Sequence, residues 1–112
     1  MSGLTTHVLD TAHGRPAAGL KLWLYADRVG IFSGETNADG RCPGLLGEAP
    51  LRRGRYTLEF AVADYYRDIG VQLADPPFLD RVRIDFGVAD PGSHYHVPLL
   101  VSPFSYATYR GS

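Results

Sequence analysis

The chain has 112 residues, of which 45% are hydrophobic and 21% charged, a composition typical of globular proteins and unlike that of disordered chains. A chain of this length is expected to fold as a single domain, residues 1–112, around one core. Its 11 basic and 12 acidic residues leave a formal net charge of -1, so no overall positive field favours binding to nucleic acid.

The cysteine content and the first residues bear on location. Cys42 is the only cysteine, so no disulfide can form within the chain and a reducing cytoplasm is sufficient. The residues after Met1 contain neither a basic segment nor an apolar run of signal length, and no stretch is apolar for long enough to span a bilayer. We therefore expect a soluble, cytoplasmic protein without a membrane partner.

Short strands dominate the predicted secondary structure. Glycine and proline, 13 and 8 in number, divide the chain into pieces spaced about ten residues apart, which is typical of an all-β domain. Alternating apolar residues, or a β-branched and aromatic composition, predict strands over residues 4–10, 20–25, 30–36, 56–62, 81–86, 93–101 and 104–110. One short helix is predicted over 61–69, and irregular crossings over 40–54 and 74–79 suggest a Greek-key sandwich. Pro98 stands inside a predicted strand although it cannot donate to a ladder.

Three histidines are candidates for a functional site. His94 and His96 are two residues apart in a predicted strand, so they project from one face with Cα atoms about 6.6 Å apart. In the first predicted strand, alternation places Thr5, His7 and Leu9 on one face. Periodicity alone does not say whether that face meets His94 and His96.

The residues leave three interpretations of these histidines open. They can be solvated side chains on a strand face. They can bind a catalytic zinc ion, because a strand-borne His-x-His with one distant histidine is a known ligand pattern. They can also act as general acid and base, because the unperturbed pKa of histidine lies near the pH of a cell.

Arg41 and Cys42 follow the Asp39-Gly40 turn. We expect the guanidinium of Arg41 at a loop edge, either free to hold a carbonyl or anionic oxygen or simply solvated. Cys42 is followed by proline and lies in no nucleophile motif, so a structural thiol is expected. The sequence contains no glycine-rich phosphate loop, nucleophile elbow or paired-cysteine zinc spacing.

Three parts of the chain resemble a known family. They are LTTHVLD with GRPA at 4–10 and 14–17, TNADGR at 36–41, and YHVPLLVSPFSYATYRGS at 95–112. They are similar to the 5-hydroxyisourate hydrolases, the transthyretin-like enzymes of urate breakdown in purine metabolism. The terminal YRGS is the most specific element, because in this family it separates the enzymes from the hormone-carrying transthyretins, which lack it.

This resemblance implies a transthyretin-like sandwich of two four-stranded sheets with one short helix, in agreement with the predicted strands. It implies a homotetramer with active sites at subunit interfaces, and hydrolysis of 5-hydroxyisourate to 2-oxo-4-hydroxy-4-carboxy-5-ureidoimidazoline without cofactor or metal. Carried over by matching motif, His7, Arg41 and His96 are the catalytic residues. The substrate pocket is then shaped by Tyr109, Arg110, Gly111 and Ser112, with His94 as an accessory residue.

The expected mechanism uses water as the nucleophile. His7 and His96 hold and deprotonate it, while Arg41 orients the substrate and stabilises the charge on the carbonyl oxygen. Which histidine takes the proton stays open. The alternative function is a non-catalytic carrier of a small ligand on the same fold, although an apolar carrier channel gains nothing from titratable groups that must be desolvated.

Overall fold

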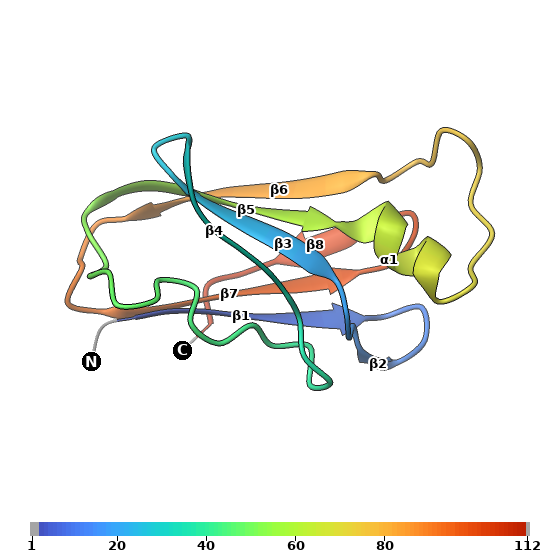
Figure 1. Cartoon of the computed structure of the whole chain (residues 1–112), viewed down its shortest axis with the longest axis horizontal. Helices are drawn as coiled ribbons and strands as arrows, with labels where there is room; N and C mark the ends of the chain where they lie inside the picture. Colours follow the sequence, from blue (N-terminus) through green and yellow to red (C-terminus); the bar gives the residue numbers. More distant parts are fainter. Residues whose placement is uncertain (1–2, 112) are drawn as a thin grey trace.

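Two four-stranded sheets packed face to face form the body of the protein. The computed structural model describes residues 3–111, and within them the first sheet has the strand order β2-β1-β7-β8 and the second the order β4-β3-β5-β6 (Figure 1). The elements are β1 (Gly3–Asp10), β2 (Arg15–Pro16), β3 (Lys21–Ala26), β4 (Val29–Glu35), β5 (Gly54–Ala61), α1 (Val62–Asp68), β6 (Arg81–Val88), β7 (His94–Val101) and β8 (Tyr106–Thr108).

Alternation along the strands separates the core from the outer faces. Residues of β1 are by turns half-buried and buried along the whole strand, because successive side chains point to opposite faces of a sheet. The core between the sheets is built largely from fully buried aliphatic and aromatic side chains, including Leu22, Leu24, Leu58, Phe60 and Leu99. Burying each of these is worth about 1.5–3 kcal/mol, and it fixes which residues of each strand face outward.

Parallel pairing of β1 with β7 joins the two ends of the chain. Figure 1 shows these strands side by side, and their register places Gly3 opposite His94, Thr5 opposite His96 and His7 opposite Pro98. Opposite residues of paired strands project from the same face. The outer face of the first sheet therefore carries both the N-terminal and the C-terminal histidines.

Helix α1 is attached to the end of β1 through the carboxylate of Asp10, which is 0% exposed. The hydroxyls of Tyr65 and Tyr66 donate to it at 2.8 and 2.9 Å, and His13 Nδ1 lies 2.7 Å from it. Burial alone would raise the pKa of Asp10, but these hydrogen bonds outweigh it and lower the pKa. Burial and the Asp10 charge raise the pKa of Tyr65 to about 12. The cluster fixes α1 over one end of the sandwich (Figure 1).

Pro98 occupies a place where the β7–β8 ladder is interrupted. Strand β7 pairs with β8 as far as Leu99, opposite Thr108, and pairing returns only as an isolated bridge between His96 and Gly111. The carbonyl of Pro98 accepts a hydrogen bond from the Thr108 hydroxyl at 2.7 Å. Since proline has no N–H to donate, the ladder breaks there, and a proline inside this strand is tolerated.

The predicted architecture of two four-stranded sheets with one short helix is confirmed. The predicted helix 61–69 is observed as Val62–Asp68, whereas the strand predicted over 104–110 is limited to Tyr106–Thr108. Strand β2, with two residues, lies where only turn chemistry was predicted. Within residues 3–111, no helix has the length and apolar composition needed to cross a bilayer.

Candidate active site

The outer face of β1 and β7 gathers three polar side chains around one hydroxyl. Thr5 Oγ1 lies 2.9 Å from His94 Nε2 and 2.8 Å from His96 Nδ1. All three residues are half-buried. This contact follows from the parallel register, in which Thr5 is the direct neighbour of His96 and Gly3 leaves room for the ring of His94.

A tight turn brings Arg41 beside His7. The side chain of Asn37 accepts the N–H groups of Asp39 and Arg41, and His7 pairs with Arg41 as an isolated antiparallel bridge. At Gly40, φ is +76° and a Cβ atom would lie 2.4 Å from the Val8 carbonyl oxygen. The turn therefore requires glycine at this position to lie against β1, which explains the glycine of ADGR.

His7 is oriented by the same turn. Its Nε2 lies 2.8 Å from the carbonyl oxygen of Asp39. A carbonyl oxygen only accepts hydrogen bonds, so the neutral imidazole carries its proton on Nε2 and leaves the lone pair on Nδ1. The turn thus sets both the ring orientation and the tautomer of His7.

The C-terminal segment packs on His96. The N–H of Gly111 donates to the carbonyl of His96 at 2.8 Å. A Cβ atom at Gly111 would lie 2.5 Å from His96 Cδ2, closer than real Cβ atoms come, so only glycine fits against the ring without displacing it. Ser112, a predicted pocket residue, lies outside the described residues.

The electrostatic surroundings of His96 favour its neutral form. Burial is the main cause that lowers its pKa below the ordinary value of 6.5, and the positive charge of Arg41 lowers it further, as do His7 and His94 when they are protonated. A histidine with a lowered pKa is neutral at neutral pH and can accept a proton. The arrangement can therefore deprotonate a water molecule bound on this face.

Two predicted pocket residues lie apart from this cluster. The guanidinium of Arg110 stacks 3.9 Å from the ring centroid of Tyr95, which is a core residue on the opposite face of β7 from His94 and His96. It also donates to the His94 carbonyl at 3.2 Å. Tyr109, 60% exposed, borders a mostly apolar groove between β6 and β8.

The structure therefore brings together five of the eight residues predicted for the site, namely His7, Arg41, His94, His96 and Gly111. Two contributors were not singled out from the sequence: the hydroxyl of Thr5 and the carbonyl of Asp39. Strand alternation already placed Thr5 on the face of His7. The register with β7 makes Thr5 a neighbour of His96, and the sequence around Thr5 does not indicate this register.

One ring nitrogen of each histidine on this face has a protein partner. His94 Nε2 and His96 Nδ1 both lie on the Thr5 hydroxyl, and His7 Nε2 lies on a backbone carbonyl. In the part of the chain that the structure describes, no group of three His, Cys, Asp or Glu side chains is placed to hold a metal ion. Burial raises the pKa of the Cys42 thiol, as expected for a structural cysteine.

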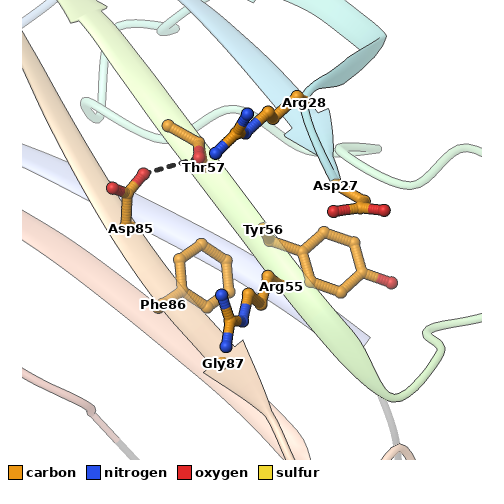
Figure 2. Close-up of a pocket in the computed structure, with 8 residues that line it drawn as sticks. All are labelled: Asp27, Arg28, Arg55, Tyr56, Thr57, Asp85, Phe86 and Gly87. Atoms are coloured by element: carbon orange, nitrogen blue, oxygen red, sulfur yellow. Dashed lines mark hydrogen bonds between the residues drawn. The ribbon is translucent and has the colours of Figure 1, made fainter.

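The outer face of the second sheet also has an open depression, of about 690 Å³ (Figure 2). Charges of both signs border it, and the hydroxyl of Thr57 donates to Asp85 at 2.6 Å. Beside it, the carboxylate of Glu59 is 2% exposed and accepts from Arg81 at 3.2 Å. The Glu59 charge is thus paired, and the depression lies on the other sheet from the histidines.

Comparison with known proteins gives this geometry a family. Residues 4–111 match the family model described as the HIUase/Transthyretin family. The chain belongs to this family. The resemblance found in the three sequence segments is therefore confirmed, and the two-sheet architecture is the transthyretin-like sandwich.

Similar members of the HIUase/transthyretin family include enzymes and a transthyretin solved in complex with thyroxine. The 5-hydroxyisourate hydrolase of Ralstonia nicotianae is 59% identical over 118 residues and covers 100% of both chains. The structure of Klebsiella pneumoniae 5-hydroxyisourate hydrolase superposes with a TM-score of 0.84 at 35% identity, over 97% of this chain and 98% of that chain. Sea bream transthyretin in complex with thyroxine gives a TM-score of 0.82 at 32% identity, over 96% and 93% of the two chains.

Proposed function

We propose that this protein, as one functional domain, hydrolyses 5-hydroxyisourate to 2-oxo-4-hydroxy-4-carboxy-5-ureidoimidazoline. One observation carries the proposal: His7, Arg41 and His96 share one face of the first sheet with Gly111 of the terminal YRGS packed on His96. The 59% identity with a full-length 5-hydroxyisourate hydrolase supports it. A carrier of a small ligand would not need a neutral, half-buried histidine and a guanidinium on this face.

In the proposed mechanism, water attacks a carbonyl carbon of the substrate ring. His96, neutral because its pKa is lowered, takes the proton of the water, and His7 holds the water through its free Nδ1. The guanidinium of Arg41 stabilises the negative charge that develops on the carbonyl oxygen. The ring C–N bond then breaks, the nitrogen takes the proton back from His96, and the carboxylic acid that forms loses its proton to solvent to give a carboxylate.

We further propose that the protein acts as a homotetramer with sites at subunit interfaces. The aromatic rings of Phe78 and Phe104 are 74% and 73% exposed, and their centroids lie 6.4 Å apart. Adjacent exposed aromatic side chains are typical of protein–protein contacts. Light scattering is expected to give four times the mass of the chain, and a monomer with full activity would contradict the assembly proposal.

We place the protein in the cytoplasm, as a protein that binds neither nucleic acid nor membranes. Its single cysteine is buried and forms no disulfide, which suits a reducing compartment. Its net charge of -1 gives no field that attracts polyanions. Fractionation of cells that express the protein tests this location.

The enzymatic proposal is tested by following the ultraviolet absorbance of freshly made 5-hydroxyisourate with and without the protein. We expect its decay to be faster with the protein, and His96→Asn to lower kcat by about 10²–10⁴-fold, the usual contribution of a positioned base. His13→Asn is the matched control, since His13 contacts Asp10 at the other end of β1. Decay at the spontaneous rate with the folded wild-type protein would refute the function. Near-normal turnover by the His96 variant would remove His96 from the mechanism.

A further inference from the structure

We propose that Thr5 is a positioning residue whose hydroxyl relays a proton between His96 and His94. The inference rests on the proposed hydrolase function. It starts from one juxtaposition: a single hydroxyl oxygen lies within 2.9 Å of one nitrogen of each imidazole, Nε2 of His94 and Nδ1 of His96. No other side chain that the structure describes at this site is hydrogen-bonded to either of these two nitrogens.

The hydroxyl couples the tautomers of the two rings. It has one proton and two lone pairs, so it donates to one imidazole and must accept from the other. When Thr5 donates to His94 Nε2, His96 Nδ1 carries a proton, and its Nε2 has a free lone pair. When Thr5 donates to His96 Nδ1, the Nε2 of that neutral ring carries the proton instead. Thr5 therefore decides whether His96 presents a base or an acid at Nε2.

Proton uptake from water creates a charge that His96 holds poorly. After Nε2 has taken the proton, the imidazolium is half-buried and lies in the field of the positive guanidinium of Arg41. The relay moves this charge in one concerted step. His96 Nδ1–H gives its proton to Thr5 Oγ1, and the Thr5 proton passes to His94 Nε2. Two bonds to hydrogen break and two form, so the positive charge leaves His96 and is carried by His94.

The relay also restores His96 for the second half of the reaction. With its charge on His94, His96 is neutral and holds the water-derived proton on Nε2. When that proton goes to the departing ring nitrogen, the two shifts through Thr5 reverse and return a proton to Nδ1. The cycle leaves Thr5 and both histidines in their starting protonation states. In this scheme His94 has a defined role, as the group that holds the charge.

Two substitutions at Thr5 separate the hydroxyl from the shape of the side chain. Thr5→Val keeps the branched shape but removes the hydroxyl, and we expect kcat to fall about 10–10²-fold with little change in KM, because ground-state binding is not affected. Thr5→Ser keeps the hydroxyl and is expected to restore most of the rate. Thr6→Val is the control for loss of a hydroxyl on β1, since Thr6 bonds to the Val97 carbonyl on the buried face. It is expected to lower stability without lowering kcat.

A double-mutant cycle tests the link itself. If Thr5 acts only through His94 and His96, then His94→Asn costs about as much in kcat as Thr5→Val, and the double variant costs no more than either single one. Effects of Thr5→Val and His94→Asn that multiply would overturn the proposal, and so would a wild-type kcat for Thr5→Val.

A spectroscopic readout keeps the inference separate from the function. The ¹⁵N shifts of the imidazole nitrogens report the tautomer of each ring without substrate. We expect Thr5→Val to change the tautomer populations of both His94 and His96, and Thr5→Ser to preserve them. If the wild-type protein does not hydrolyse 5-hydroxyisourate but the shifts change together, the function is wrong and the coupling stands. Unchanged shifts in Thr5→Val would refute the coupling even if the protein is active.

Discussion

Gly111 lies so close to the imidazole of His96 that a Cβ atom on it would come within 2.5 Å of His96 Cδ2. The backbone of the same residue is hydrogen-bonded to the His96 carbonyl, so the end of the chain is fixed to the strand that it covers. The absence of a side chain at Gly111 thus allows the imidazole of His96 to occupy its observed position.

Gly111→Ala is therefore expected to displace the ring of His96 or the end of the chain and to lower kcat. Displacements of about 1 Å at a catalytic group can cost about 10²-fold, and we expect a loss of that order. Steady-state kinetics and thermal unfolding check it, with stability little changed. Gly87→Ala is the matched control, because nothing lies within 4 Å of a Cβ atom there. Equal kcat values for the two variants would contradict the packing argument.

The acid limb of the kcat/KM profile should lie below pH 6.5. His96 must be neutral to accept a proton, and burial together with the positive charge of Arg41 lowers its pKa. The rate therefore rises with pH through that lowered pKa. In Arg41→Gln one positive neighbour is gone, so the limb is expected to move to higher pH in the residual activity. A limb that moves to lower pH in this variant would show that another group controls it.

Asp10→Asn should destabilise the fold without changing the outer face of β1 and β7 that carries the histidines. The carboxylate is fully buried and accepts from two tyrosine hydroxyls, and hydrogen bonds to a buried charge are costly to lose. We expect the free energy of unfolding to fall by about 2–4 kcal/mol. Urea denaturation measures this loss of unfolding free energy. As the control, kcat is measured at a temperature where both proteins are folded, and it is expected to be unchanged.

The same carboxylate makes stability depend on acid pH. Since the folded-state pKa of Asp10 is lowered from 3.8, its contribution is fully present above the unfolded value and is lost as the pH falls through the folded one. Wild-type stability is expected to drop below about pH 4, and the Asp10→Asn variant to show a flatter dependence. Parallel pH dependence in the two proteins would assign acid unfolding to other carboxylates.

Activity is expected to survive exhaustive treatment with a chelator. One imidazole nitrogen of each of His94 and His96, both on β7, is hydrogen-bonded to Thr5 on β1. A metal ion bound at these two nitrogens would have to replace the bonds to Thr5. The measurement is 5-hydroxyisourate decay before and after treatment with EDTA. Loss of activity that zinc restores would favour the zinc interpretation of the His-x-His pattern over acid–base catalysis.

Local pattern predicted the faces of the strands well. A period of two residues determines that Thr5 and His7 point to one side of β1 and His94 and His96 to one side of β7, and the structure agrees. The turn before Arg41 was likewise predicted from Asp39-Gly40 chemistry.

What the sequence did not predict depends on contacts between distant segments. The parallel register of β1 and β7 arises from packing of whole strands, so nothing near Thr5 indicates that it contacts His96. The burial of Asp10 depends on tyrosines 55 and 56 residues away in the sequence. Strand β2 has only two residues, too few for a periodic signal.

The pairing of β1 with β7 has a consequence for how the protein acquires activity. The Thr5–His96 contact spans 91 positions of the sequence, so nearly the whole chain must be synthesised and its ends must meet before the reactive face exists. Long-range strand pairing is slow because loop closure costs entropy before contacts repay it. Recovery of turnover during refolding will therefore coincide with the final folding phase, and catalysis serves as a reporter of the completed native state.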